Sequence, residues 1–454
     1  MLNLILGLLV IVSSAACGKD DPIVPKGPNV VNEYQQYGTP FAGVPETRDA
    51  TIYQVNIRSF SSGRNFAGVT ARLDSIKALG VNVIYLMPIH PVGKEKAFNS
   101  PYCVKDYKAV NPEFGTLNDL RALVDGAHQR GMAVLLDWVG NHTSWDHAWM
   151  ANADWYDRDD NGNIISPHGW TDIAQLNFDN QAMRLEMIKA MKYWVYQANI
   201  DGYRCDYSDG PPVDFWKQAI DTLRNISTHK LLLLAEGTRA ENFSAGFDYN
   251  FGFRYYEQLK RVFGNDQQDA SSLQSMNTTE YTGAAENQMV VRYITNHDVN
   301  SSDGTPLDLF GGDKGSVSAF ITAAYMKGVP MVYTGQEVGT PYRLTFPFTG
   351  TVVNWSLNPA MKAEYKKIIA FRNSSEAIRR GTLSTHSNAS VVAFTKTVPA
   401  ETVFVACNMR DASSTLTLPA GVASATWQDA FTGQQVNTSQ SITLQPYEYV
   451  VLRK

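Results

Sequence analysis

Residues 231–237 of the chain read Leu231-Leu232-Leu233-Leu234-Ala235-Glu236-Gly237. The first five residues are all apolar, which is typical of a parallel strand that helices cover on both faces. A carboxylate follows at once, where the strand should end. In a barrel of parallel strands, functional side chains gather at that end. The stretch therefore predicts a buried barrel strand that carries Glu236 into a site.

Similar strands and helices alternate on both sides of this stretch. With Leu231–Ala235, we expect strands at Ile52–Ile57, Val81–Leu86, Ala133–Trp138, Gly202–Asp206, Phe247–Tyr249, Met289–Thr295 and Pro330–Tyr333. Helical patterns lie between them, among them Leu117–Gln129, Gln181–Ala198, Val213–Asn225 and Lys314–Met326. Eight strands with helical crossovers predict a (β/α)8 barrel over residues 46–375.

The connection after the third strand is too long for an ordinary crossover. It predicts a short subdomain over residues 141–178. Within it, Asp157-Arg158-Asp159-Asp160-Asn161-Gly162 matches the opening of a calcium loop. The twelfth position of that loop is His168 rather than Glu, and Asn161-Gly162 is a strong hairpin signal, so we favour a hairpin.

Residues 376–454 show a different pattern. Short runs alternate apolar and polar residues between Gly, Pro and Asn turns, which favours antiparallel strands. We expect these strands at Val391–Thr395, Thr402–Ala406, Ser414–Leu418, Ala425–Asp429 and Tyr447–Leu452. The pattern predicts a separate C-terminal β-sandwich.

The N-terminus is typical of an exported protein. An apolar run over residues 2–12 is too short to span a bilayer and suits a signal peptide, which we place at residues 1–16. Small residues precede Cys17 and resemble a bacterial lipobox, although Ser14 stands where that pattern usually has Leu. We therefore expect Cys17 to carry lipid.

A polar, Pro-rich stretch follows over residues 17–45 and predicts a tether. Together these segments indicate a periplasmic or cell-surface protein that is anchored by lipid to the outer membrane. We expect the anchor to be its only membrane contact.

Composition and charge exclude several classes of function. The chain has 39 Lys+Arg against 44 Asp+Glu and no basic run, which argues against nucleic-acid binding. Cys103, Cys205 and Cys407 form no CxxC pair and no zinc spacing. We expect free buried thiols, with a Cys103–Cys205 disulfide as the alternative, and a monomer.

Polar residues gather where four of the strands end. The segments are Leu136–His142, Gly202–Asp206, Leu234–Gly237 and Ile294–Asp298. They should place three carboxylates, two imidazoles and an arginine around one barrel mouth: Asp206, Glu236, Asp298, His142, His297 and Arg204. Glycosidic bond cleavage needs such a set, because one carboxyl protonates the leaving oxygen and another attacks or activates water.

These four segments resemble the four signature regions of the α-amylase family, glycoside hydrolase family 13. Further stretches agree with the resemblance: Ile52–Val55, Leu86–Ile89, Ser100–Tyr107 and Asn111–Gly115. The resemblance implies that Asp206 is the nucleophile of a covalent intermediate and that Glu236 is the general acid/base. It implies that Asp298 is the third carboxylate, which grips sugar hydroxyls.

The resemblance also implies a set of substrate contacts. Arg204 should keep Asp206 ionised, His142 and His297 should bind sugar hydroxyls, and Tyr102 should lie under the cleaved sugar. We expect Tyr53 on the first strand to contact substrate as well. Asn141 matches a position that is often a calcium ligand in the family.

Three departures from the family pattern bear on specificity and metal binding. Ser100-Pro101 replaces the usual His-Gly before Tyr102, and Asp209-Gly210 replaces a Lys-His that lines the leaving-group side in many α-amylases. Gln175 stands where many members have a calcium-binding Asp. We therefore expect no required cofactor, and weak or absent binding of Ca²⁺.

The sequence predicts a retaining α-glucan hydrolase that cleaves α-1,4-glucosidic bonds in starch or maltooligosaccharides by double displacement. A transglycosidase that uses the same site is one alternative. A non-catalytic carbohydrate-binding lipoprotein on the same scaffold is the other, although such relatives usually lose one of the three carboxylates.

Overall fold

A computed structural model describes residues 33–264 and 268–454 of the chain. The expected signal peptide, Cys17 and most of the tether lie outside the described residues. Among the residues that are described, no helix is both long and apolar enough to cross a membrane.

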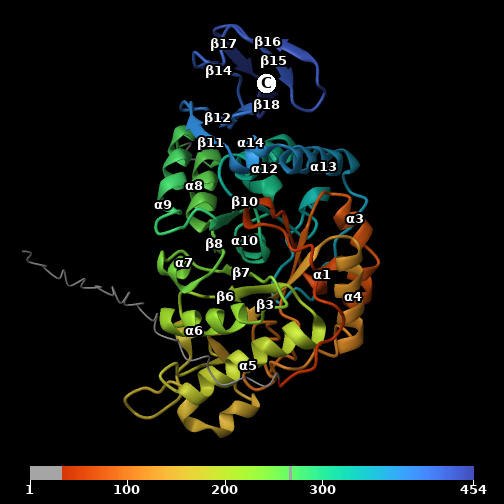
Figure 1. Ribbon diagram of the computed structural model, residues 1–454, viewed down its shortest axis with the longest axis vertical. Helices are drawn as coiled ribbons and strands as arrows, with labels where there is room; N and C mark the ends of the chain where they lie inside the picture. Colours follow the sequence, from red (N-terminus) through yellow and green to blue (C-terminus); the bar gives the residue numbers. More distant parts are fainter. Residues whose placement is uncertain (1–32, 265–267) are drawn as a thin grey trace, which may run out of the picture.

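Eight parallel strands close into a barrel at the centre of the molecule (Figure 1). They are β1 (Ile52–Val55), β2 (Val83–Leu86), β3 (Ala133–Val139), β6 (Gly202–Asp206), β7 (Leu232–Ala235), β8 (Tyr249–Phe251), β9 (Met289–Arg292) and β10 (Val329–Tyr333). Every residue of these strands is buried, as expected for strands that helices cover on the outside. The predicted barrel is confirmed.

Helices cover the outside of the barrel and connect its strands. The longer ones are α4 (Leu117–Gln129), α5 (Gln181–Ala198), α6 (Val213–Arg224), α8 (Phe253–Phe263), α12 (Gly312–Tyr325) and α13 (Pro359–Ser374). The shorter ones are α1 (Ile57–Phe60), α2 (Phe66–Thr70), α3 (Leu73–Lys77), α7 (Glu241–Ala245), α9 (Met276–Thr279), α10 (His297–Ser302), α11 (Pro306–Leu309) and α14 (Glu376–Arg380). Short 3₁₀ turns complete the connections: η1 (Thr47–Asp49), η2 (Ala148–Ala151), η3 (Ala153–Trp155), η4 (Pro167–Gly169), η5 (Ala270–Ser275) and η6 (Gln336–Val338).

Helix α4 shows how local sequence fixes these elements. Thr116 and Asp119 form a capping box that satisfies backbone N–H groups of its first turn. Its buried residues recur three to four positions apart and face the barrel: Leu120, Leu123, Val124 and Ala127.

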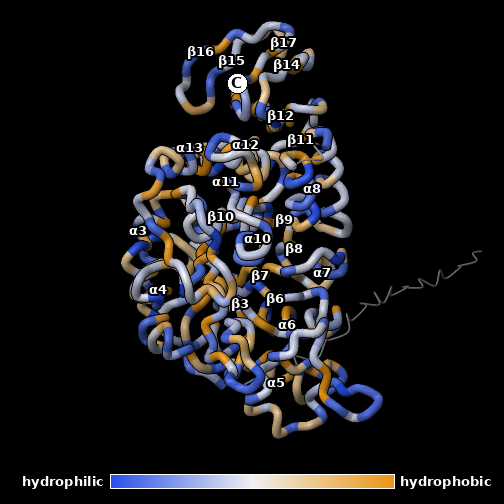
Figure 2. Tube along the Cα trace, turned by 180° about the vertical axis from the view of Figure 1, so that it is seen from behind, coloured by the Kyte–Doolittle hydropathy of each residue, from blue (hydrophilic) through white to orange (hydrophobic). Residues whose placement is uncertain are grey.

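The whole molecule shows the same division between interior and surface. In Figure 2 hydrophobic residues concentrate in the interior, and hydrophilic residues lie mainly on the outer loops.

Seven of the eight predicted barrel strands differ from the structure by one to three residues at an end, and only Gly202–Asp206 has the predicted bounds. The first ends at Val55, because the chain turns at Asn56 into helix α1. There the Asn56 backbone N–H donates to the Thr334 hydroxyl at 2.9 Å, and its side chain donates to the Tyr333 hydroxyl at 2.8 Å. Strand β8 lies two residues later than predicted, and β9 ends at Arg292, three residues earlier than predicted.

The long connection after β3 folds over the barrel mouth as predicted from its length. Its strands β4 (His142–Ser144) and β5 (Ile173–Gln175) pair antiparallel. Arg158 and Ile164 also pair antiparallel, and the Asp159 carboxylate accepts backbone N–H bonds from Asn161 and Asn163. This arrangement is the hairpin that we favoured over a calcium loop.

The C-terminal strands form two packed sheets at one end of the molecule (Figure 1). The larger sheet contains β11 (Thr382–Thr385), β12 (Val391–Val398), β13 (Glu401–Asn408), β15 (Thr426–Asp429), β16 (Gln435–Asn437) and β18 (Tyr449–Arg453). The smaller contains β14 (Ser414–Thr417) and β17 (Ser441–Leu444). Buried residues of both sheets share one apolar cluster that includes Phe404, Leu416 and Trp427, so the predicted all-β domain is confirmed.

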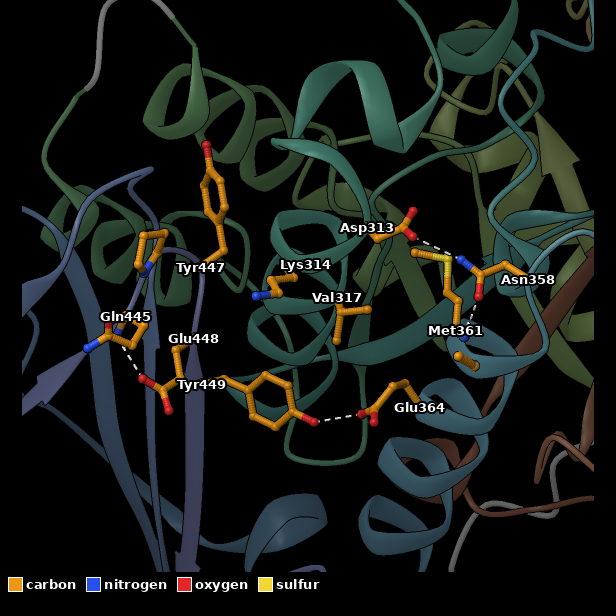
Figure 3. A pocket seen from close by; sticks show the side chains of 12 residues that line it. Asp313, Lys314, Val317, Asn358, Met361, Glu364, Gln445, Tyr447, Glu448 and Tyr449 are labelled. Carbon is orange, nitrogen blue, oxygen red and sulfur yellow. Dashed lines mark hydrogen bonds between the residues drawn. The ribbon is translucent and has the colours of Figure 1, made fainter.

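Side chains join this β-domain to the barrel. The Tyr449 hydroxyl donates to Glu364 of α13 at 2.7 Å, and the Ser318 hydroxyl of α12 donates to the Tyr447 carbonyl at 2.6 Å. A cavity of about 490 Å³ lies beside these contacts, as Figure 3 shows.

The three described cysteines are buried and free: Cys103, Cys205 and Cys407. This excludes the alternative of a Cys103–Cys205 disulfide.

Candidate active site

Arg204 organises the carboxylates at the barrel mouth. It lies in β6, is almost fully buried, and its Nη1 is 2.7 Å from Asp137 and 2.8 Å from Asp206. Its Nη2 forms an ion pair with Glu236, which directly follows β7. Because one rigid guanidinium holds both carboxyls, Asp206 and Glu236 face the same space above it.

A second group of side chains lies beside the carboxylates. The Tyr102 hydroxyl is 2.6 Å from Nε2 of His297 and donates to Asp137 at 3.0 Å. Nδ1 of His297 is 2.8 Å from Nε2 of Gln54, and its Nε2 is 3.3 Å from Asp298. The side chain of Asp298 is 59% exposed, so it is free to meet a ligand in the cleft.

Burial dominates the protonation of the two inner carboxyls. It raises the pKa of Asp206 to about 7, and the Arg204 guanidinium only partly opposes it. Burial likewise raises the pKa of Glu236 well above its usual value, again against the opposing charge of Arg204. Arg204 thus acts on Asp206 in the expected direction, because its charge lowers the pKa of the carboxyl, while burial acts against it.

The neighbouring imidazoles are neutral for the same reason. Burial lowers the pKa of His142 to about 4 and also lowers the pKa of His297. Neutral imidazoles can donate one hydrogen bond and accept another, which suits contact with hydroxyl groups.

These residues line a cleft of about 570 Å³. Six of the residues predicted from sequence meet there or directly beneath it: Tyr102, His142, Arg204, Asp206, Glu236 and His297, with Asp298 at the rim. Sequence reasoning missed the aromatic residues that also line the cleft: Phe98, Trp170, Tyr207 and Phe346. Phe98, Trp170 and Phe346 are 61%, 42% and 48% exposed, and such exposure of large apolar rings could not be read from their sequence positions.

Tyr53 lies elsewhere. It is fully buried in β1, and its hydroxyl donates to Glu337 at 2.9 Å. Burial raises the pKa of Glu337 to about 7. The structure therefore gives Tyr53 a packing position and does not bring it into the cleft.

The residues at the expected calcium position fit the ion poorly. Asn141 Nδ2 donates to Gln175 Oε1 at 3.0 Å, and Gln175 Nε2 donates back to Asn141 Oδ1 at 3.2 Å. Both amides are neutral and satisfy each other. Across residues 33–264 and 268–454, no three His, Cys, Asp or Glu side chains form a group that could hold a metal.

Asp209 does not add a charge to the cleft. Its carboxylate accepts bonds at 2.9 Å from the Thr238 backbone and from the Asn242 side chain. These contacts fix the loop after β7. Although Asp209 replaces the Lys of the family pattern, its carboxylate is held by Thr238 and Asn242 and does not line the cleft.

A closed parallel barrel with two buried carboxyls at its mouth defines a glycoside hydrolase scaffold, and sequence comparison agrees. Residues 54–170 and 155–345 match the family described as alpha amylase, catalytic domain, and the chain belongs to that family. Residues 382–451 match the C-terminal domain of maltogenic amylase.

The chain is similar in sequence to several known α-amylases. It is 28% identical to the α-amylase MalA of Haloarcula japonica over 66% of this chain and 46% of that protein. It is 25% identical to α-amylase 2 of Dictyoglomus thermophilum over 84% of this chain and 69% of that protein. The chain thus spans less than half the length of the first relative. A crystal structure of an α-amylase from Lactobacillus plantarum shares the fold, with a TM-score of 0.80 and 24% sequence identity. The match covers 90% of this chain and 99% of the other.

Proposed function

We propose that the protein is a retaining α-glucan hydrolase that cleaves α-1,4-glucosidic bonds in maltooligosaccharides or starch. The observation that carries this proposal is the pairing of Asp206 and Glu236 with Nη1 and Nη2 of the buried Arg204 guanidinium. Two carboxyls held close together at one bond suit double displacement, because one can attack while the other protonates the leaving oxygen.

The proposed reaction has two steps. Glu236 donates its proton to the glycosidic oxygen while the Asp206 carboxylate attacks the anomeric carbon, which forms a covalent β-glycosyl ester. The Glu236 carboxylate then removes a proton from water, which displaces Asp206 and releases an α-anomer. The raised pKa of Glu236 supports its role as the acid in the first step.

Side chains around the carboxyls would hold the sugar. The Tyr102 and His297 rings stack with centroids 5.4 Å apart and form one wall beside the bond to be cleaved. Exposed Asp298 and buried His142 offer acceptors and donors to hydroxyl groups. Neutral amides at Asn141 and Gln175 support a reaction that needs no calcium.

Chromatography of the products from maltotriose, amylose and pullulan tests the proposal. We expect maltose and glucose from maltotriose, and cleavage of the α-1,4 bonds of amylose. Products longer than the substrate would instead support the transglycosidase alternative. Absence of turnover on all three would support a carbohydrate-binding protein.

We also propose that the protein acts as an exported monomer that is held at the outer membrane by lipid on Cys17. Small residues before Cys17 support this proposal. Replacement of Cys17 by Ser should move the protein from the membrane fraction to the soluble fraction. Retention in the membrane fraction would contradict the lipid anchor.

A further inference from the structure

Two loops meet beside the proposed acid, and each carries a charged side chain that binds the backbone of the other. The turn after β6 contains Asp209, and the loop after β7 contains Arg239. Neither side chain lines the cleft. Their contacts therefore act on the loops and not on a ligand.

The Asp209 carboxylate reaches from the turn to the loop. Its Oδ2 accepts the Thr238 backbone N–H at 2.9 Å, and its Oδ1 accepts the fully buried Asn242 amide at 2.9 Å. A Cβ atom at Gly237 would lie only 2.2 Å from Oδ1 of Asp209, so the loop approaches the carboxylate closely. Bonds to an ionised acceptor are stronger than bonds between neutral groups, so this contact fixes the backbone directly after Glu236.

The Arg239 guanidinium reaches in the opposite direction. Its Nη2 donates to the carbonyls of Ser208 and Pro211, each at 2.8 Å, and its Nη1 donates to the Asp209 carbonyl at 3.3 Å. Its Nε donates to Oδ1 of Asn242 at 2.9 Å. One planar, rigid fork thus holds three carbonyls of the turn and one side chain of its own loop.

The turn that these residues hold also contacts Glu236 itself. The Tyr207 backbone N–H donates to Oε2 of Glu236 at 2.8 Å, and the Ser208 backbone N–H donates to the Glu236 carbonyl at 3.0 Å. A shift of the turn would therefore move a donor that orients the carboxyl. A general acid must lie within about 2.6–3.2 Å of the atom that receives its proton, so a small shift is enough to impair the transfer.

We propose that Asp209 and Arg239 are positioning residues, which hold the turn after β6 against the loop after β7 and so keep the Glu236 carboxyl within reach of the leaving oxygen. The inference rests on the proposed hydrolase function. It gives Asp209 a role that the Lys of the family pattern could not fill, because an ammonium group only donates and cannot accept the Thr238 N–H.

Two aryl substrates test this role. Phenyl α-maltoside and 4-nitrophenyl α-maltoside have the same glycosyl part and leaving groups of similar shape. The 4-nitrophenolate ion leaves with little protonation, whereas phenol needs a proton from the acid. We expect Asp209→Ala to lower kcat/KM at least about tenfold more on the phenyl substrate than on the nitrophenyl substrate. A lost contact with the leaving group, or a general loss of structure, would lower both values equally.

Further variants grade the effect. Asp209→Asn keeps an oxygen for the Thr238 N–H but cannot also accept from the Asn242 amide, so its ratio of losses should be smaller than that of Asp209→Ala. Asp209→Lys should show at least the ratio of the Ala variant, because it removes both acceptors and repels Arg239. Arg239→Lys should change the ratio in the same direction, because a point charge replaces the planar fork.

Asp159→Ala is the matched control, because Asp159 also accepts two backbone N–H bonds, from Asn161 and Asn163, but in the hairpin of the subdomain. Its effects on the two substrates should be equal. Equal losses for Asp209→Ala, or for Asp209→Asn if the Ala variant does not fold, would overturn the inference alone. No turnover of either aryl maltoside or of maltotriose by the wild-type protein would overturn the proposed function, and the inference with it.

Discussion

The backbone N–H of Tyr207 donates to Oε2 of Glu236 at 2.8 Å, so the residue after the proposed nucleophile orients the proposed acid. The contact joins the ends of neighbouring barrel strands β6 and β7. It also holds one oxygen of the Glu236 carboxyl in place. Variants that keep this backbone bond and change only one of the two carboxyls can therefore separate the roles of Asp206 and Glu236.

The first prediction separates acid from nucleophile. Asp206→Asn should lower kcat by at least about 10⁴-fold on every substrate, because no nucleophile remains. Glu236→Gln should lose about 10²–10⁴-fold on maltotriose but much less on α-maltosyl fluoride, whose leaving group needs little protonation. Steady-state kinetics on both substrates measure the difference, and equal losses for Glu236→Gln would contradict its role as acid.

A second prediction concerns pH. Attack requires ionised Asp206, whose pKa burial raises to about 7, so kcat/KM should fall as pH drops below about 7. On this acidic limb kcat/KM should approach a tenfold decrease per pH unit. The upper limb should reflect loss of the proton from Glu236, whose pKa is also raised. A pH profile that stays flat down to about pH 5 would show that Arg204 outweighs burial.

The third prediction concerns calcium. Because Asn141 and Gln175 satisfy each other as neutral amides, we expect Ca²⁺ or chelator to leave the melting temperature unchanged. Gln175→Asp should introduce a charged ligand and make the melting temperature rise with Ca²⁺ concentration. Gln434→Asp, on an exposed turn, is the control for added charge. A lower melting temperature of the wild-type protein in chelator would refute this account.

A fourth prediction concerns stability and Lys396. This residue of β12 is buried, donates to the Ile378 carbonyl at 2.7 Å, and its pKa falls to about 7. Between about pH 7 and 10 the unfolded chain binds the proton that the folded chain releases. The free energy of unfolding should therefore rise with pH in that window, by up to about 1.4 kcal/mol per pH unit.

Lys396→Met should remove this pH-dependent rise. Denaturant unfolding of both proteins between pH 7 and 10 measures it. Lys77→Met is the control, because Lys77 contacts a backbone carbonyl on the exposed surface. The account of Lys396 fails if wild-type protein and Lys396→Met keep the same difference in stability at every pH.

The barrel and its polar strand ends could be predicted because each depends on local patterns. Apolar runs such as Leu232–Ala235 and the Asp or Glu that follows them are visible in the sequence. The partners of Asp209 could not be predicted, because Thr238 and Asn242 are distant from it in sequence. Tyr207 was missed because only its left-handed backbone turns the ring into the cleft.

Proton NMR of the first product tests the central claim most directly. When the protein cleaves maltotriose, double displacement at Asp206 predicts that the newly formed reducing end appears first as the α-anomer, before mutarotation. Initial appearance of the β-anomer would contradict the covalent intermediate and the roles given to Asp206 and Glu236.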